Sequence, residues 1–185
     1  TAVADKSLAR TGEDCVPQIV PAEGFRISSV TDAERGACLE VKVPEAPLAG
    51  EPFAGACTRL SLREPVPLPK EVGGVGLWVK GDSNGGMIGF EVEDANGNLY
   101  RCNGRRPMTL DFDGWNFLSA PFSARDSQVW IQRTYAKSGE HLAPPLKLKS
   151  IIVTLNRHAF GLTAMQPVSG TVRLGGIGYS GGKEK

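Results

Sequence analysis

Glu91 and Glu93, two glutamates separated by a single residue, are the first candidates for chemistry in this chain. Apolar residues alternate with them between positions 88 and 92, and this alternation places both carboxylates on one face of a β-strand. Their Cα atoms would be roughly 6.5–7 Å apart, a separation that suits the paired carboxylates of glycoside hydrolysis. No third acid follows, because the chain reaches Asn96 in a tight turn. A solvated strand face explains the pair without catalysis, and we favour that interpretation.

A second group of candidates combines aromatic, basic and amide side chains in the middle of the chain: Tyr100, Arg101, Trp130, Gln132, Arg133 and Tyr135. Aromatic rings can stack on sugar faces, while charged and amide groups hydrogen-bond to sugar hydroxyls. Together with Glu91 and Glu93, these residues are the predicted glycan-binding set. The alternative places Trp130 in the core and leaves the arginines as solvated surface groups.

Metal, nucleophile and cofactor motifs are weak in this sequence. Asp94, Asn96 and Asn98 resemble the opening of an EF-hand loop, but the twelfth position is Arg105 instead of Glu. We therefore expect Asp94 to accept hydrogen bonds within a turn. The sequence has no Gly-x-Ser-x-Gly elbow, and its glycine-rich C-terminal segment lacks the spacing of a dinucleotide loop. No cofactor is expected.

The four cysteines are Cys15, Cys38, Cys57 and Cys102, and their spacing fits no metal knuckle. We favour a disulfide between Cys38 and Cys57, because both lie in similar apolar, strand-like segments that could run side by side. Buried free thiols are the alternative, and the sequence leaves the pairing of the other two cysteines open.

The 23 glycines and 13 prolines are scattered without a period and indicate many short strands joined by turns. Alternating or apolar segments predict strands near 37–43, 56–62, 75–81, 87–94, 99–102, 115–122, 146–155 and 170–179. Residues 63–71 are Pro-rich and should cross between sheets. Residues 76–102 predict a three-stranded meander with turns at two Asn-Gly pairs, with Trp78 facing the core. The pattern favours an all-β fold, an antiparallel β-sandwich.

The chain of 185 residues fits a single domain at 14–180, with an N-terminal linker or frayed end at 1–13 and a tail at 181–185. Its net charge of +1 argues against binding to nucleic acid. No apolar run approaches the roughly 20 residues that cross a bilayer. The first residues do not resemble a signal peptide, so we expect either that one has been removed or that the chain comes from a longer protein.

Residues 76–102, 110–122 and 170–179 together resemble the galactose-binding-like β-jelly rolls, which include many non-catalytic carbohydrate-binding modules of polysaccharide-degrading enzymes. The resemblance implies a jelly-roll sandwich in which Trp78, Asp82, Asp94 and Trp115 are framework residues. Many relatives bind a structural calcium ion through acids near the first and last strands. Glu23 matches the first of these acids, whereas Gly175 and Gly176 stand where the last strand usually carries one.

The leading functional hypothesis is therefore a non-catalytic carbohydrate-binding or accessory module that docks a polysaccharide or oligosaccharide on a sheet face or loop rim. We expect a secreted, periplasmic or cell-surface location. The alternative is a structural or protein-interaction domain that contacts the neighbouring domains of a multidomain secreted enzyme. The third hypothesis is a small jelly-roll glycoside hydrolase or lyase that uses Glu91 and Glu93.

Overall fold

The computed structural model describes residues 26–43, 57–82, 87–102, 108–122, 129–131, 142–154, 156–157, 166–167 and 170–181, and within these ranges every regular element is a β-strand. The strands are β1 (Arg26–Asp32), β2 (Gly36–Val43), β3 (Cys57–Pro67), β4 (Val72–Asp82), β5 (Met87–Glu93), β6 (Leu99–Cys102), β7 (Met108–Thr109), β8 (Asp113–Pro121), β9 (Val129–Ile131), β10 (Lys147–Thr154), β11 (Asn156–Arg157), β12 (Gln166–Pro167) and β13 (Gly170–Gly181).

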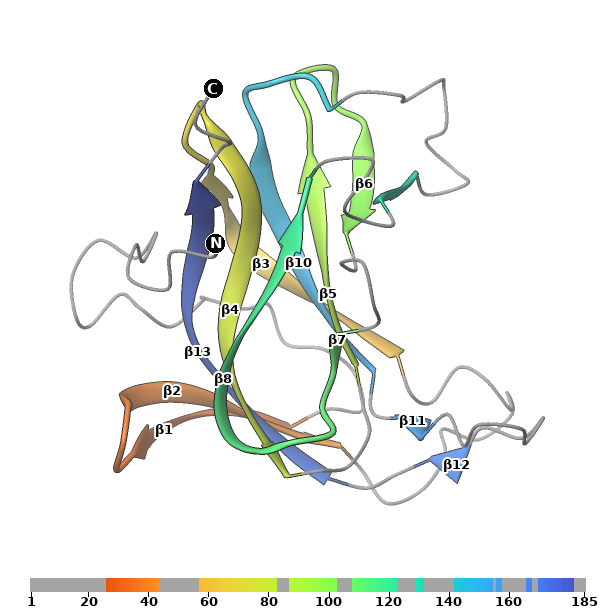
Figure 1. Cartoon of the computed structure of the whole chain (residues 1–185). Coiled ribbons are helices and arrows are strands. Elements are labelled where there is room, and N and C mark those ends of the chain that lie inside the picture. Colours follow the sequence, from red (N-terminus) through yellow and green to blue (C-terminus); the bar gives the residue numbers. More distant parts are fainter. Residues whose placement is uncertain are drawn as a thin grey trace.

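Two antiparallel sheets form the body of the protein (Figure 1). Sheet 1 has the order β1-β2-β13-β4-β8, and sheet 2 has the order β3-β10-β5-β6-β9 with β7 also paired to β5. The short strands β11 and β12 pair separately. This arrangement confirms the predicted antiparallel β-sandwich.

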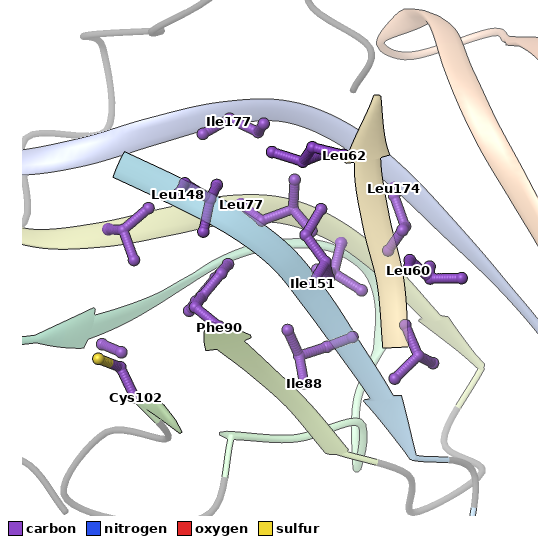
Figure 2. Packing of buried hydrophobic residues seen from close by; sticks show 14 of the residues in the cluster. Leu60, Leu62, Leu77, Ile88, Phe90, Cys102, Leu148, Ile151, Leu174 and Ile177 are labelled. Carbon is purple, nitrogen blue, oxygen red and sulfur yellow. The ribbon is translucent and has the colours of Figure 1, made fainter. Parts of the chain in front are cut away.

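Alternation along the strands builds the core between the sheets. Val75, Leu77 and Val79 of β4 are fully buried, and so are Phe90 and Val92 of β5. Figure 2 shows side chains of both sheets pointing toward one another in this layer, with Leu77, Leu174 and Ile177 from sheet 1 and Leu60, Phe90 and Ile151 among those from sheet 2. The inward residues fix which side chains each sheet presents outward, because neighbours along a strand face opposite ways.

The connections between strands correct part of the sequence prediction. The Pro-rich segment carries the chain from β3 in sheet 2 to β4 in sheet 1, as predicted. However, β4 and β5 belong to different sheets, so the predicted three-stranded meander is wrong. The hairpin of β5 and β6 is confirmed, with Glu93 opposite Leu99 as its last pair. The first predicted Asn-Gly turn, at 84–85, lies outside the described residues.

Two further predictions on the framework are wrong. Trp78 lies between the inward-facing Leu77 and Val79, so it faces away from the core. A disulfide between Cys38 and Cys57 is not formed, because β2 and β3 lie in different sheets and Cys38 is a buried free thiol. Cys102 is also buried and free, and burial raises the pKa of its thiol to about 12. Cys15 lies outside the described residues.

No helix in the described part of the chain is long and apolar enough to cross a membrane. The predicted boundaries at residues 13 and 180 remain predictions, because residues 1–25 and 182–185 fall outside the described ranges.

Candidate functional site

A single row of residues crosses sheet 2 on the face turned away from the core. The strand register pairs Ser61 with Ser150, Ser150 with Glu91, Glu91 with Arg101, and Arg101 with Trp130. Residues paired across strands share a face of the sheet. The register therefore places Glu91 and Arg101 side by side, and it pairs the backbone of Trp130 with that of Arg101, although β9 lies far along the sequence from β5. We call this surface the outer face of sheet 2.

Glu91 forms the centre of this row and is held by two neighbouring strands. Its Oε1 accepts a hydrogen bond of 3.0 Å from Ser150 Oγ, and its Oε2 lies 3.0 Å from Arg59 Nη2. The Glu91 side chain is 4% exposed, whereas that of Arg59 is 51% exposed. The interpretation of a solvated face is therefore wrong at Glu91, and so is its predicted direct contact with a ligand. Glu91 instead anchors Arg59, a residue that the sequence analysis missed.

Glu93 is held separately from Glu91. Its Oε2 lies 3.1 Å from Lys149 Nζ, and both side chains are partly exposed. Lys149 occupies the position where the register of β10 with β5 shifts between Leu148 and Ser150. Each glutamate is thus ion-paired to a different cation, Glu91 to Arg59 and Glu93 to Lys149.

Arg101 is half-buried, and its Nε–H is shielded from solvent with no hydrogen-bond partner among the described residues. A buried donor left without an acceptor costs about 1–3 kcal/mol, and more for a charged group. Buried donors of this kind are rare and indicate an acceptor that is missing, such as water or a ligand. The Nε–H of Arg101, on the outer face of sheet 2, therefore has no acceptor within the described protein.

The structure corrects the role predicted for Tyr100. This residue is 2% exposed, on the core side of β6, and its hydroxyl donates to Asp94 Oδ2 at 3.3 Å. It therefore supports the β5–β6 hairpin and offers no surface to a ligand.

Asp94 itself organises the hairpin loop, as predicted. Its Oδ1 accepts hydrogen bonds of 2.9 Å from the backbone N–H groups of Asn96 and Asn98. Burial by itself raises the pKa of the Asp94 carboxyl, but hydrogen bonds from Asn98, Ala143 and Asn96 outweigh it and leave the pKa lowered. Asp94 is thus a structural carboxylate.

The remaining predicted site residues are placed only in part. Trp130 belongs to β9 and takes its place in the row through its backbone pairing with Arg101. Gln132, Arg133 and Tyr135 lie outside the described residues, as does Glu23 with its predicted calcium site. Among the residues that the structure does describe, no group of three or more His, Cys, Asp or Glu side chains could hold a metal ion.

Sheet 1 carries a different polar cluster on its own outer face. Asp32 Oδ2 accepts hydrogen bonds of 2.8 Å from Lys80 Nζ and from Arg173 Nη1, and Oδ1 accepts one of 3.0 Å from Trp115 Nε1. The backbone N–H of Glu34 donates to the same carboxylate at 2.9 Å. These hydrogen bonds, that from Lys80 foremost, hold the pKa of Asp32 well below its usual range. We call these residues the Asp32 cluster.

Aromatic rings surround the Asp32 cluster. The Arg35 guanidinium lies 3.2 Å from the centroid of the Trp78 ring, a cation–π contact. A Cβ added at Gly175 would lie 3.1 Å from Trp78 Cβ and 3.2 Å from Trp115 Cζ3, so Gly175 provides the space in which the two tryptophans pack over β13. A side chain at position 175 would therefore collide with both tryptophans. The sequence analysis missed Asp32, although Asp32 to Gly36 has the composition of a turn.

The fold was compared with solved structures. A family 11 carbohydrate-binding module of the cellulosomal cellulase Lic26A-Cel5E of Clostridium thermocellum is 17% identical, with a TM-score of 0.53 over 89% of this chain and 86% of that one. The chain has the β-sandwich fold of a carbohydrate-binding module. The Clostridium thermocellum module in complex with a β-1,3-1,4-mixed-linked tetrasaccharide has the same identity, a TM-score of 0.51 and coverage of 89% and 88%.

The resemblance to carbohydrate-binding modules is one of fold, since the identities are low. No protein-family model matches the sequence, and no curated protein matches it either. Function in this carbohydrate-binding-module fold must therefore be argued from its own residues, above all from the outer face of sheet 2.

Proposed function

We propose that this chain is a non-catalytic carbohydrate-binding module that docks an oligosaccharide or polysaccharide chain on the outer face of sheet 2. The observation that carries the proposal is the partnerless Nε–H of Arg101 within a row of polar residues that crosses the sheet. Arg59, Arg101 and Glu93 would donate or accept hydrogen bonds to sugar hydroxyls, and Trp130 would supply a ring for stacking. We propose a secreted or cell-surface location for such a module.

The contacts of Glu91 and Glu93 support binding over catalysis. A hydrolase needs one carboxyl group that gives a proton and another that acts as base or nucleophile. Here each carboxylate is ion-paired to a different side chain, Glu91 to Arg59 and Glu93 to Lys149. These ion pairs hold Arg59 and Lys149 in place at the surface.

Affinity electrophoresis through gels containing mixed-linkage β-glucan, xylan, glucuronoxylan or polygalacturonate tests the proposal. We expect retention of the wild-type protein in at least one gel. Removing a stacking ring in Trp130→Ala should weaken binding about tenfold, which corresponds to about 1.4 kcal/mol. Arg59→Gln should weaken it less, because Arg59 is half-exposed.

Arg35→Gln provides the matched control, since Arg35 is an exposed arginine in the turn between β1 and β2 of sheet 1. It should leave retention unchanged. Migration unaffected by every polysaccharide, or equal losses in the Arg35 and Trp130 variants, would contradict the proposed function.

A further inference from the structure

We infer that the ligand of the outer face of sheet 2 is an acidic glycan, and that Arg101 is the residue that selects its carboxylate. The inference rests on the proposed function and adds the class of ligand to it. Its starting point is the difference between Arg101 and the other basic residues of the same face.

The charges of this face do not balance. The register and the ion pairs place four basic residues here against two acidic ones: Arg59, Arg101, Lys147 and Lys149 against Glu91 and Glu93. The exposed Arg63 and Glu64, where the register of β3 with β10 shifts, add one charge of each sign. The described residues of this face therefore carry an excess of positive charge, in a chain whose net charge is only +1.

Both acidic residues of this face already have partners within the protein. Glu91 is held by Arg59 and Ser150, and Glu93 is held by Lys149. Arg101 lies directly opposite Glu91 in the register, yet it forms no ion pair with any described residue. No described residue therefore compensates the charge of its guanidinium.

A carboxylate fits this guanidinium better than a sugar hydroxyl does. A hydroxyl can accept the Nε–H but leaves the charge uncompensated, which is unfavourable for a half-buried group. A carboxylate accepts two parallel N–H bonds from the planar guanidinium and neutralises it as well. Uronic acid residues carry such a carboxylate on the sugar ring, beside the hydroxyls that Arg59 and Glu93 can bind.

The test compares each of two uronate polymers, glucuronoxylan and polygalacturonate, with its carboxyl-reduced counterpart. We expect the wild-type protein to bind at least one native polymer about tenfold more tightly than the reduced form, with a preference that weakens as salt is added. Arg101→Gln should abolish the preference, so that the variant binds the native and the reduced polymer with equal affinity. Arg101→Lys keeps the charge without the planar fork and should retain part of the preference.

Two controls separate this inference from its alternatives. Arg35→Gln should keep the full preference, and dextran sulfate should compete less well than the uronate polymer at equal charge. Equal affinity of the wild-type protein for native and reduced polymers would overturn the inference while the proposed function stands, and absence of binding to every polymer would overturn both.

Stronger binding to dextran sulfate, or an equal loss of preference in the Arg35 variant, would show general attraction of anions and overturn the role of Arg101. Should Arg101→Gln fail to fold, as judged by its melting curve, the Lys variant decides: an unchanged preference would contradict the role of the planar fork.

Discussion

Each sheet of the sandwich presents an arginine on its outer face, Arg173 on β13 and Arg101 on β6, and the surroundings of the two side chains differ. Arg173 donates to Asp32 at 2.8 Å and to Glu40 at 3.0 Å, so its guanidinium is paired on two sides. Arg101 faces a glutamate that other residues already hold, and its Nε–H has no acceptor within the described structure. Arg173 therefore completes a hydrogen-bond network in sheet 1, whereas Arg101 in sheet 2 has a donor that no described residue accepts.

This difference separates a face whose described charges are paired with one another from the face on which we propose that the ligand binds. In sheet 1, the Asp32 cluster and the stacked Arg35 attach the tip of the β1–β2 hairpin to the tryptophans of β4 and β8. These groups hydrogen-bond to or stack on one another, as is typical of residues that stabilise the fold. This agrees with the framework role expected for Trp78 and Trp115. In sheet 2, the partnerless group lies among polar side chains suited to hold sugar hydroxyls.

The largest effect is expected from Asp32→Asn, which tests whether the outer face of sheet 1 is structural. The amide cannot neutralise Lys80 and Arg173, so Lys80 loses its carboxylate partner and Arg173 keeps only Glu40. We expect a fall of several degrees in the melting temperature without loss of glycan retention. Asp82→Asn, at an exposed position of β4, is the control and should change the melting temperature little.

Acid titration of the same variant sharpens this expectation. Because folding lowers the pKa of Asp32, its contribution is complete above the unfolded pKa, about 3.9, and is lost as the pH falls through the folded value. The wild-type protein should therefore lose stability below about pH 4. The Asn variant should lose less over that range, since Asp94 is then the only carboxyl among the described residues whose pKa folding lowers. Parallel curves for the two proteins would show that Asp32 carries no special stabilisation.

A smaller effect separates the two arginines directly. Arg173→Met removes hydrogen bonds to two carboxylates and should lower the free energy of unfolding by about 1–2 kcal/mol. Arg101→Met keeps the aliphatic stem and removes a donor that has no acceptor, so the free energy of unfolding should stay constant or rise by about 1 kcal/mol. Urea denaturation of both variants measures the difference. A larger loss in the Arg101 variant would mean that Arg101 is part of the framework.

The strands of this fold could be predicted from the sequence, whereas their division between sheets could not. Alternating residues in β2, β4, β5 and β10 give the correct elements, because periodicity is a local property. The chain nevertheless changes sheets between β4 and β5, and the segment that joins them resembles a hairpin turn in its sequence. The first strand, β1, was not predicted.

The site could be predicted to a similar extent. The register of the β5–β6 hairpin follows from local sequence, and it alone places Arg101 beside Glu91. The Asp32 cluster could not be found in this way, because Asp32 lies 48 residues from Lys80 and 141 residues from Arg173 in the sequence. The burial of Glu91 and Tyr100 likewise depends on tertiary packing and on Arg59 from another strand.

The central claim, that a glycan binds sheet 2 and leaves sheet 1 untouched, is tested most directly by NMR. The chain has three tryptophans, so their indole N–H signals can be followed together with the Nε–H signal of Arg101 during titration with oligosaccharides from a polysaccharide that retains the protein. The account predicts that the signals of Trp130 and Arg101 shift with the same dissociation constant, while those of Trp78 and Trp115 do not move. Shifts at Trp78 or Trp115 with an unchanged Arg101 signal would contradict it and would place the ligand on sheet 1.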